Sequence, residues 1–119
     1  MTAPGLRRCC LDRPGASEEF PFGPQTSVFK VAGKMFALSR LDGQPLEVSL
    51  KCEPELSELL RAGNAAIRPG YHLNKRHWIT VTLDGSIPDT MVRDLVEDSY
   101  DLVVAGLAAR DRSLLAFPD

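Results

Sequence analysis

The sequence predicts a single α+β domain built around an antiparallel sheet. Two observations carry this prediction: three strand-like runs follow one another at hairpin spacing in the first half of the chain, and two apolar stripes with helical spacing occur further on. The chain has 119 residues, of which 44% are apolar and 25% charged, enough for one core but not for two. We therefore treat residues 1–119 as one domain.

The N-terminal segment is predicted to form one short helix, because Leu6, Cys9 and Cys10 are spaced i, i+3, i+4 on a single face. Pro14-Gly15 ends this helix. Residues 16–25 follow with two prolines and one glycine, which predicts a loop without regular structure. We expect two aromatic side chains to hold this loop against the core: Phe20 and Phe22.

The next part of the chain is predicted to form an antiparallel meander. Its three strands are expected at residues 28–31, 35–38 and 46–51. The first two flank Ala32-Gly33-Lys34, where Gly33 can supply the positive φ that a tight hairpin needs. Asp42-Gly43 marks the second turn. Apolar and polar residues alternate from 46 to 51, which is typical of a strand that is buried on one face.

Two helices and one further strand complete the predicted fold. A short helix begins at Pro54 after Glu53 and ends at Gly63-Asn64, with a stripe of three leucines: Leu56, Leu59 and Leu60. A longer helix is expected from Ser86, as its cap, to Gly106. Its core-facing band should comprise Met91, Val92, Leu95, Val96, Ser99, Leu102 and Val103. Beyond it no pattern is compelling, although three apolar side chains could dock on the domain: Leu114, Leu115 and Phe117.

The remaining strand is predicted at residues 77–83, where the side chains alternate between two faces. The aliphatic face should join the core: Ile79, Val81 and Leu83. The other face carries an aromatic ring and two hydroxyls: Trp78, Thr80 and Thr82.

Residues 68–78 concentrate more recognition groups than any other part of the chain. They hold both histidines, the single tryptophan, one of the two tyrosines and three cations. Four basic residues and no acid occur between residues 61 and 78, whereas six acids and one arginine occur between 84 and 101. A protein with a formal charge of −2 can therefore still attract a polyanion locally. We call residues 68–77 the basic-aromatic segment.

The sequence contains no convincing catalytic or metal-binding pattern. His72 and His77 lack a nearby third ligand other than Asp84, and neither a Gly-x-Ser-x-Gly elbow nor a glycine-rich phosphate loop occurs. The cysteines show no ligand spacing and are expected to be reduced and packed as small apolar groups: Cys9, Cys10 and Cys52. We predict a non-enzymatic protein without a metal or cofactor.

No apolar run approaches the ~20 residues that span a bilayer, and no apolar stretch of signal-peptide length follows Arg7 and Arg8. Together with the reduced cysteines, this predicts a cytoplasmic protein that does not contact membranes. The oligomeric state is open from the sequence, and we favour a monomer.

Four motifs are distinctive: Arg-Pro-Gly-Tyr-His-Leu-Asn-Lys-Arg-His-Trp at 68–78, Leu-Asp-Gly-Ser-Ile-Pro-Asp at 83–89, Phe-Pro-Phe-Gly-Pro at 20–24 and Ser-Tyr-Asp-Leu-Val at 99–103. Together they resemble the MmcQ/YjbR family of small bacterial proteins. The resemblance covers residues 11–107 in order and leaves 108–119 as a C-terminal tail. It implies a CyaY-like α+β fold, with helices packed on one face of an antiparallel sheet, and DNA binding by a "double wing" of hairpins. Asp12-Arg13 and Glu53 depart from the family's usual residues.

The leading functional hypothesis is a DNA-binding module that uses the basic-aromatic segment and one further hairpin tip. Four cations would contact phosphates: Lys34, Arg68, Lys75 and Arg76. His72 and Asn74 would reach toward bases, and Tyr71 would stack or pack.

Two other hypotheses remain open. The same segment could serve a protein- or small-anion-binding adaptor, which would hold its partner with Arg68, Tyr71, His72 and Lys75. A pocket lined by these residues would favour the adaptor, whereas a protruding basic surface would favour DNA. The acids between Asp94 and Asp101 also invite comparison with the iron-binding acidic helices of frataxin-like proteins, although a solvated helix face explains them as well.

Overall fold

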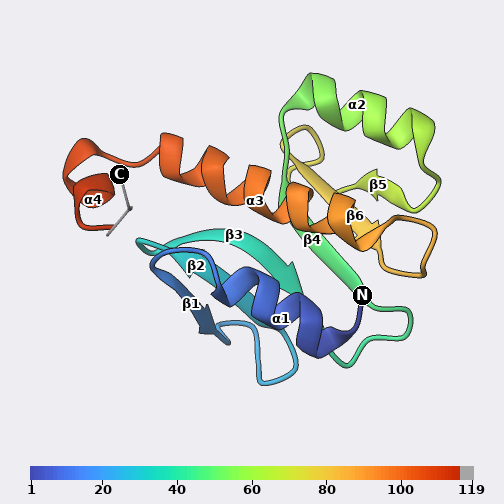
Figure 1. Ribbon diagram of the computed structural model, residues 1–119, viewed down its shortest axis with the longest axis horizontal. Helices are drawn as coiled ribbons and strands as arrows, with labels where there is room; N and C mark the ends of the chain where they lie inside the picture. Colours follow the sequence, from blue (N-terminus) through green and yellow to red (C-terminus); the bar gives the residue numbers. More distant parts are fainter. Residues whose placement is uncertain (116–119) are drawn as a thin grey trace.

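The computed structural model describes residues 1–115, which form one six-stranded antiparallel sheet and four helices (Figure 1). This architecture confirms the predicted α+β class. In chain order the elements are α1 (Ala3–Leu11), β1 (Ala16–Glu19), β2 (Ser27–Val31), β3 (Lys34–Ser39), β4 (Glu47–Lys51), α2 (Pro54–Gly63), β5 (Ile67–Pro69), β6 (Trp78–Thr82), α3 (Asp89–Ala105) and α4 (Ala109–Ser113).

The strand order in the sheet is β1-β2-β3-β4-β6-β5. Figure 1 shows α1 and α3 on the same side of this sheet, with α3 crossing the central strands. Helix α2 packs beside β5 at one edge. One face of the sheet is therefore covered by helices, and we call the other face the open face.

The direction of the strands brings two hairpin tips to the same end of the sheet. Because every neighbouring pair is antiparallel, β2, β4 and β5 run in one direction and β3 and β6 in the other. The β2–β3 turn and the β5–β6 loop therefore leave the sheet from the same end. The turn contains Ala32 and Gly33, both at positive φ (49° and 77°), as a two-residue hairpin with matching twist requires.

The core lies between the sheet and α3, as the helical stripe predicts. Most of the expected band is buried, including Val92, Val96 and Ser99, while Met91 and Leu102 are half-buried. Tyr100 is also buried, and its ring meets that of Phe36 edge-on with centroids 5.4 Å apart. The hydroxyl of Tyr100 donates to the carbonyl of Pro14, which ties the end of the first helical segment to α3.

The segment predicted as a loop at residues 16–25 contains an edge strand, so that expectation is wrong in its first part. Ala16–Glu19 forms β1 and pairs with β2 along its whole length. The prolines begin only at Pro21, so they leave the preceding backbone free to pair. Phe20 and Phe22 do not pack against the core, because they are 50% and 68% exposed.

Helix α2 buries a different side from the predicted leucine stripe. Leu59 is 72% exposed and Leu56 is also exposed, whereas Leu60 packs against the core and Ser57 is fully buried. The helix lies at the edge of the sheet, where it has one narrow contact with β5 and its outer side meets solvent. The side chain of Glu53 makes no capping hydrogen bond.

Two helix boundaries and the tail also differ from expectation. Helix α3 begins at Asp89 rather than at Ser86, because the backbone amide and hydroxyl of Ser86 both donate to the Asp84 carboxylate. The predicted end at Gly106 is confirmed. Beyond it lies the short helix α4, after which Leu115 packs against the core and Leu114 is exposed. Phe117 lies outside the described residues.

Candidate functional site

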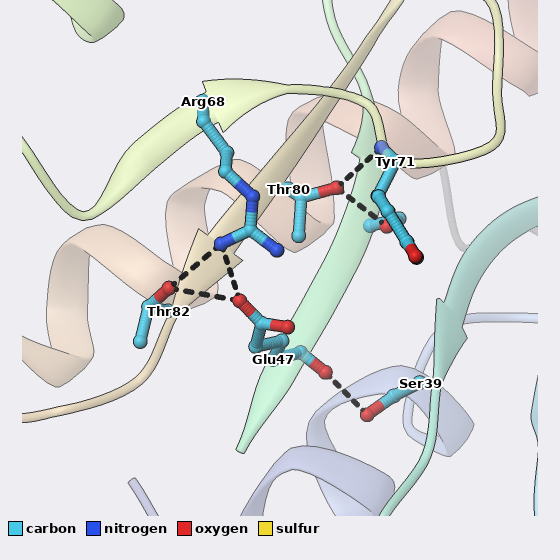
Figure 2. A network of polar contacts seen from close by, with 7 residues as sticks. Ser39, Glu47, Arg68, Tyr71, Thr80 and Thr82 are labelled. Carbon is cyan, nitrogen blue, oxygen red and sulfur yellow. Dashed lines mark hydrogen bonds and ion pairs between the residues drawn. The ribbon is translucent and has the colours of Figure 1, made fainter. Parts of the chain in front are cut away.

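The open face carries a row of polar side chains on neighbouring strands. Glu47 and Ser49 of β4 lie opposite Thr82 and Thr80 of β6, and Arg68 of β5 lies opposite Thr80. Because alternate residues of a strand point to one face, these side chains emerge on the side away from α3. Figure 2 shows the side chains of Arg68, Glu47 and Thr82 meeting, with Thr80 beside them.

Arg68 is held by an ion pair within the protein. Its Nη1 lies 2.5 Å from Glu47 Oε2, and Thr82 Oγ1 donates to the same carboxylate oxygen at 3.0 Å (Figure 2). Hydrogen bonding to Arg68, helped by Thr82, lowers the pKa of Glu47, and the carboxylate raises the pKa of Arg68 in return. The positive charge of Arg68 is therefore largely neutralised by the Glu47 carboxylate beside it.

A buried hydroxyl pair lies beside this ion pair. Ser49 Oγ and Thr80 Oγ1 are 2.9 Å apart, and Thr80 Oγ1 also accepts a hydrogen bond from the backbone amide of Tyr71 at 3.0 Å. Both residues are almost inaccessible, with 5% and 3% exposure. These contacts draw the start of the β5–β6 loop toward the open face.

The loop itself is shaped by a close backbone approach and a left-handed residue. Gly70 donates its amide to Trp78 O at 2.8 Å, and a Cβ at Gly70 would lie 2.7 Å from the Cβ of Trp78. His72 has a φ of 58°, which is uncommon outside glycine. The rings of Tyr71 and His72 lie with centroids 4.0 Å apart. The loop therefore presents an aromatic pair to solvent.

The loop tip places two cations in the open. Asn74 Oδ1 accepts from the backbone amide of Arg76 at 2.9 Å, which closes an Asx-type turn. Lys75 and Arg76 are exposed, and within residues 1–115 neither has an ion-pair partner. Lys34, at the start of β3, is also exposed and also has no ion-pair partner within residues 1–115.

A cavity of about 730 Å³ opens on the open face, and we call it the open-face cavity. Its floor includes Leu38 of β3 and the Ser49–Thr80 hydroxyl pair. Three loops form its walls, at residues 22–26, 40–45 and 71–73. Among the residues predicted for the site, Tyr71 and His72 line this cavity, whereas Arg68, Lys75 and Lys34 do not.

The structure therefore divides the predicted site residues of the basic-aromatic segment into three groups. Tyr71 and His72 form a cavity wall, Asn74 shapes the turn that carries Lys75 and Arg76, and Arg68 pairs with Glu47. Sequence reasoning missed the other lining residues, such as Phe22, Arg40 and Ser49. The polar residues of β4 and β6 alternate with core residues, and this alternation could have indicated which residues lie on the open face. The sequence around Phe22 contains no such indication.

Other chemistry-bearing groups are placed in structural roles. Cys10 and Cys52 are buried, and burial raises the pKa of each thiol, as it does for the half-buried Cys9. Across residues 1–115 no three His, Cys, Asp or Glu side chains gather as metal ligands. None of the helices in that part of the chain is long and apolar enough to cross a membrane.

The sequence matches known proteins over nearly its whole length. The model of the YjbR family matches residues 11–102. Two uncharacterised proteins of Escherichia coli O157:H7 are similar: YbdF is 45% identical over 107 residues, covering 89% of this chain and 87% of YbdF, and YjbR is 41% identical over 116 residues, covering 97% and 98%.

Solved structures show the same architecture. The crystal structure of the Deinococcus radiodurans protein DR2400, with the family-model domain DUF419, superposes with a TM-score of 0.89 at 44% identity, over 99% of this chain and 90% of that one. A crystal structure from Pseudomonas syringae superposes with a TM-score of 0.74 at 29% identity, over 86% and 98%.

Proposed function

The chain belongs to the YjbR family, and on that premise we propose that it is a non-enzymatic, cytoplasmic DNA-binding module that acts as a monomer. The two hairpin tips at one end of the sheet act as its wings. Lys34 on the first tip and Lys75 and Arg76 on the second contact DNA phosphates, and His72 and Asn74 lie beside them to approach the bases.

The observation that carries this proposal is the shared direction of the two tips. Both leave the sheet from the end at which β2 and β5 finish, and two interstrand spacings, about 10 Å at the level of the sheet, separate β3 from β6. The three exposed cations at these tips have no ion-pair partner within residues 1–115. Their charge is therefore available to a polyanion.

The geometry favours this proposal over a small-anion or protein adaptor. The adaptor hypothesis needs Arg68, Tyr71, His72 and Lys75 to grip one partner. Arg68 is instead neutralised by Glu47, and neither Arg68 nor Lys75 lines the cavity that holds Tyr71 and His72. Arg68 is accordingly not counted as a phosphate contact.

The number of contacts sets the expected salt dependence. Three phosphate contacts predict a log–log slope of about −2.7 for duplex DNA, which corresponds to an affinity loss of about 40-fold between 50 and 200 mM salt. The variant K75E/R76E removes two of these contacts, so its slope should fall to about −1, with an affinity at low salt reduced at least about tenfold. Fluorescence anisotropy with a labelled duplex measures both quantities.

The matched control carries the same charge change on the helix-covered side. Arg8 of α1 and Arg93 of α3 are exposed, and neither has an ion-pair partner within residues 1–115. R8E/R93E should keep the wild-type slope. Equal losses in both double variants, or a wild-type affinity that does not change with salt, would refute binding through the hairpin tips.

A further inference from the structure

The open-face cavity has features that phosphate contacts at the hairpin tips do not require. Its volume of about 730 Å³ lies in the range of pockets that enclose small ligands. A base inside a duplex is stacked and paired, so its faces and its Watson–Crick edge are occupied and it cannot enter such a cavity. Only an unpaired, extruded base or a free small molecule could enter it.

Two exposed aromatic rings line this cavity. Phe22 is 68% exposed and Tyr71 is 62% exposed, although both rings are large enough to gain from burial. His72 lies against the ring of Tyr71, with centroids 4.0 Å apart, and so limits the orientations that this ring can take. Oriented aromatic rings in contact with solvent are the groups on which bases stack in proteins that bind single strands.

The floor offers a spare hydrogen-bond donor. Each of the two hydroxyls, Ser49 Oγ and Thr80 Oγ1, carries one hydrogen, and their 2.9 Å contact uses only one of these two. Thr80 Oγ1 also accepts from the amide of Tyr71, and the remaining hydroxyl hydrogen has no acceptor within residues 1–115. A carbonyl or ring nitrogen on the edge of a base would supply one.

One wall of the cavity and two of the proposed phosphate contacts belong to the same loop. Tyr71, His72 and Leu73 form this wall, and Lys75 and Arg76 follow after Asn74. Tyr71 and Lys75 are four residues apart, so at most ~14 Å of chain separates them. A strand whose phosphates meet the loop tip therefore passes within reach of Tyr71 in the cavity wall.

From these observations we propose that the open-face cavity receives an unpaired base of the bound strand, so that the protein prefers single-stranded to duplex DNA. The base stacks on Tyr71 or Phe22 and accepts a hydrogen bond from the Ser49–Thr80 hydroxyl pair. This inference rests on the proposed function and names the form of DNA that it binds.

The test compares a labelled 12-nucleotide single strand with a 12-base-pair duplex at the same salt concentrations. The wild-type protein should bind the single strand more tightly, and the difference should grow as salt rises, because the slope for a single strand is shallower, about −2 for three contacts. Tyr71→Ala should weaken single-strand binding about tenfold or more and leave duplex binding within about twofold. Tyr71→Phe should retain most of the affinity, because the stacking face remains.

Two further variants separate this inference from the function on which it rests. Leu59→Ala removes an exposed apolar side chain of α2 that does not line the cavity, and it should change neither affinity. K75E/R76E should weaken both forms. If Tyr71→Ala leaves the preference unchanged, or the wild-type protein prefers the duplex, the cavity assignment is wrong while binding by the tips stands. If neither form binds, the proposed function fails as well.

Discussion

Ser99 illustrates how one hydroxyl can join three elements. Its Oγ donates to Phe36 O of β3 at 2.5 Å and accepts from the backbone amide of Lys51 of β4 at 2.8 Å. The β3–β4 ladder ends at the pair Ala37 and Leu50, so Phe36 and Lys51 would be the next partners. The hydroxyl therefore bridges two backbone groups that lie at the end of the direct pairing, and it fastens α3 to both strands.

Ser99→Ala should therefore destabilise the fold clearly, although it removes only one oxygen atom. The substitution leaves the carbonyl of Phe36 and the amide of Lys51 without their hydrogen-bond partner inside the fold, and we expect a loss of about 2–3 kcal/mol in the free energy of unfolding. Urea denaturation measures it. The control is Ser17→Ala, at an exposed serine of β1, which should change the free energy of unfolding by less than about 0.5 kcal/mol. If Ser99→Ala lowers the stability no more than Ser17→Ala does, the bridging role of Ser99 is contradicted.

The ion pair of Arg68 and Glu47 yields a prediction for both binding and pH dependence. Glu47→Gln removes the partner charge of Arg68, so a fourth cation becomes available to DNA at neutral pH. The affinity for duplex should rise and the salt slope should become steeper by about one unit. An unchanged slope would mean that Arg68 does not reach the bound DNA even when it is unpaired.

The same pair stabilises the fold only when Glu47 is ionised. Because the pKa of Glu47 is lowered in the folded state, its stabilisation is complete above the ordinary carboxyl pKa and is lost as the pH falls through the lowered value. The pair is partly exposed, so the effect should stay below about 1 kcal/mol. Wild type and Glu47→Gln should therefore differ in stability at neutral pH and converge in acid.

At the scale of elements, the β5–β6 connection depends on a close approach of two strands. A Cβ at Gly70 would lie 2.7 Å from Trp78 Cβ, which is closer than two carbon atoms can pack, and 3.1 Å from Trp78 O, which is a tight contact. Gly70→Ala must push the loop away from β6 and should cost about 1–3 kcal/mol of stability. Because the displaced residues form the cavity wall, single-strand binding should also weaken.

Gly63→Ala provides the control for this substitution. Gly63 is the last residue of α2, and a Cβ there would meet no atom within 4 Å. Alanine favours helix over glycine, so this variant should be neutral or more stable by up to about 1 kcal/mol. Equal stability of the two variants in thermal or urea unfolding would contradict the close approach at Gly70.

Other elements differ in how far local sequence determines them. Strands β4 and β6 and helix α3 follow their apolar periodicity, because a buried face leaves its period in the sequence, and β2 and β3 coincide with the predicted apolar runs. Strand β1 lacks such a periodic signal, because it is an edge strand of four residues whose side chains are alternately half-buried and exposed. Helix α2 has a clear stripe, yet the sheet edge covers only part of it.

At the scale of the whole molecule, charge is distributed between two sides. The acids of α3, including Asp94, Glu97 and Asp98, are exposed on the helix-covered side, and burial together with the neighbouring carboxylates raises the pKa of Asp98. The unpaired cations Lys34, Lys75 and Arg76 lie at the hairpin tips. A polyanion is thus repelled by one side and attracted at one end of the sheet, which orients its approach despite a net charge of −2.

The sequence by itself determined the α+β class, most strands, the core face of α3 and the location of the basic-aromatic segment. These features depend on the spacing of residues along the chain, because residues spaced at the period of a strand or a helix lie on the same face of it. Tertiary structure decided the pairing of Arg68 with Glu47, 21 residues away, and the assembly of one cavity from three separate loops. Such contacts depend on which distant segments meet, and no local period records that.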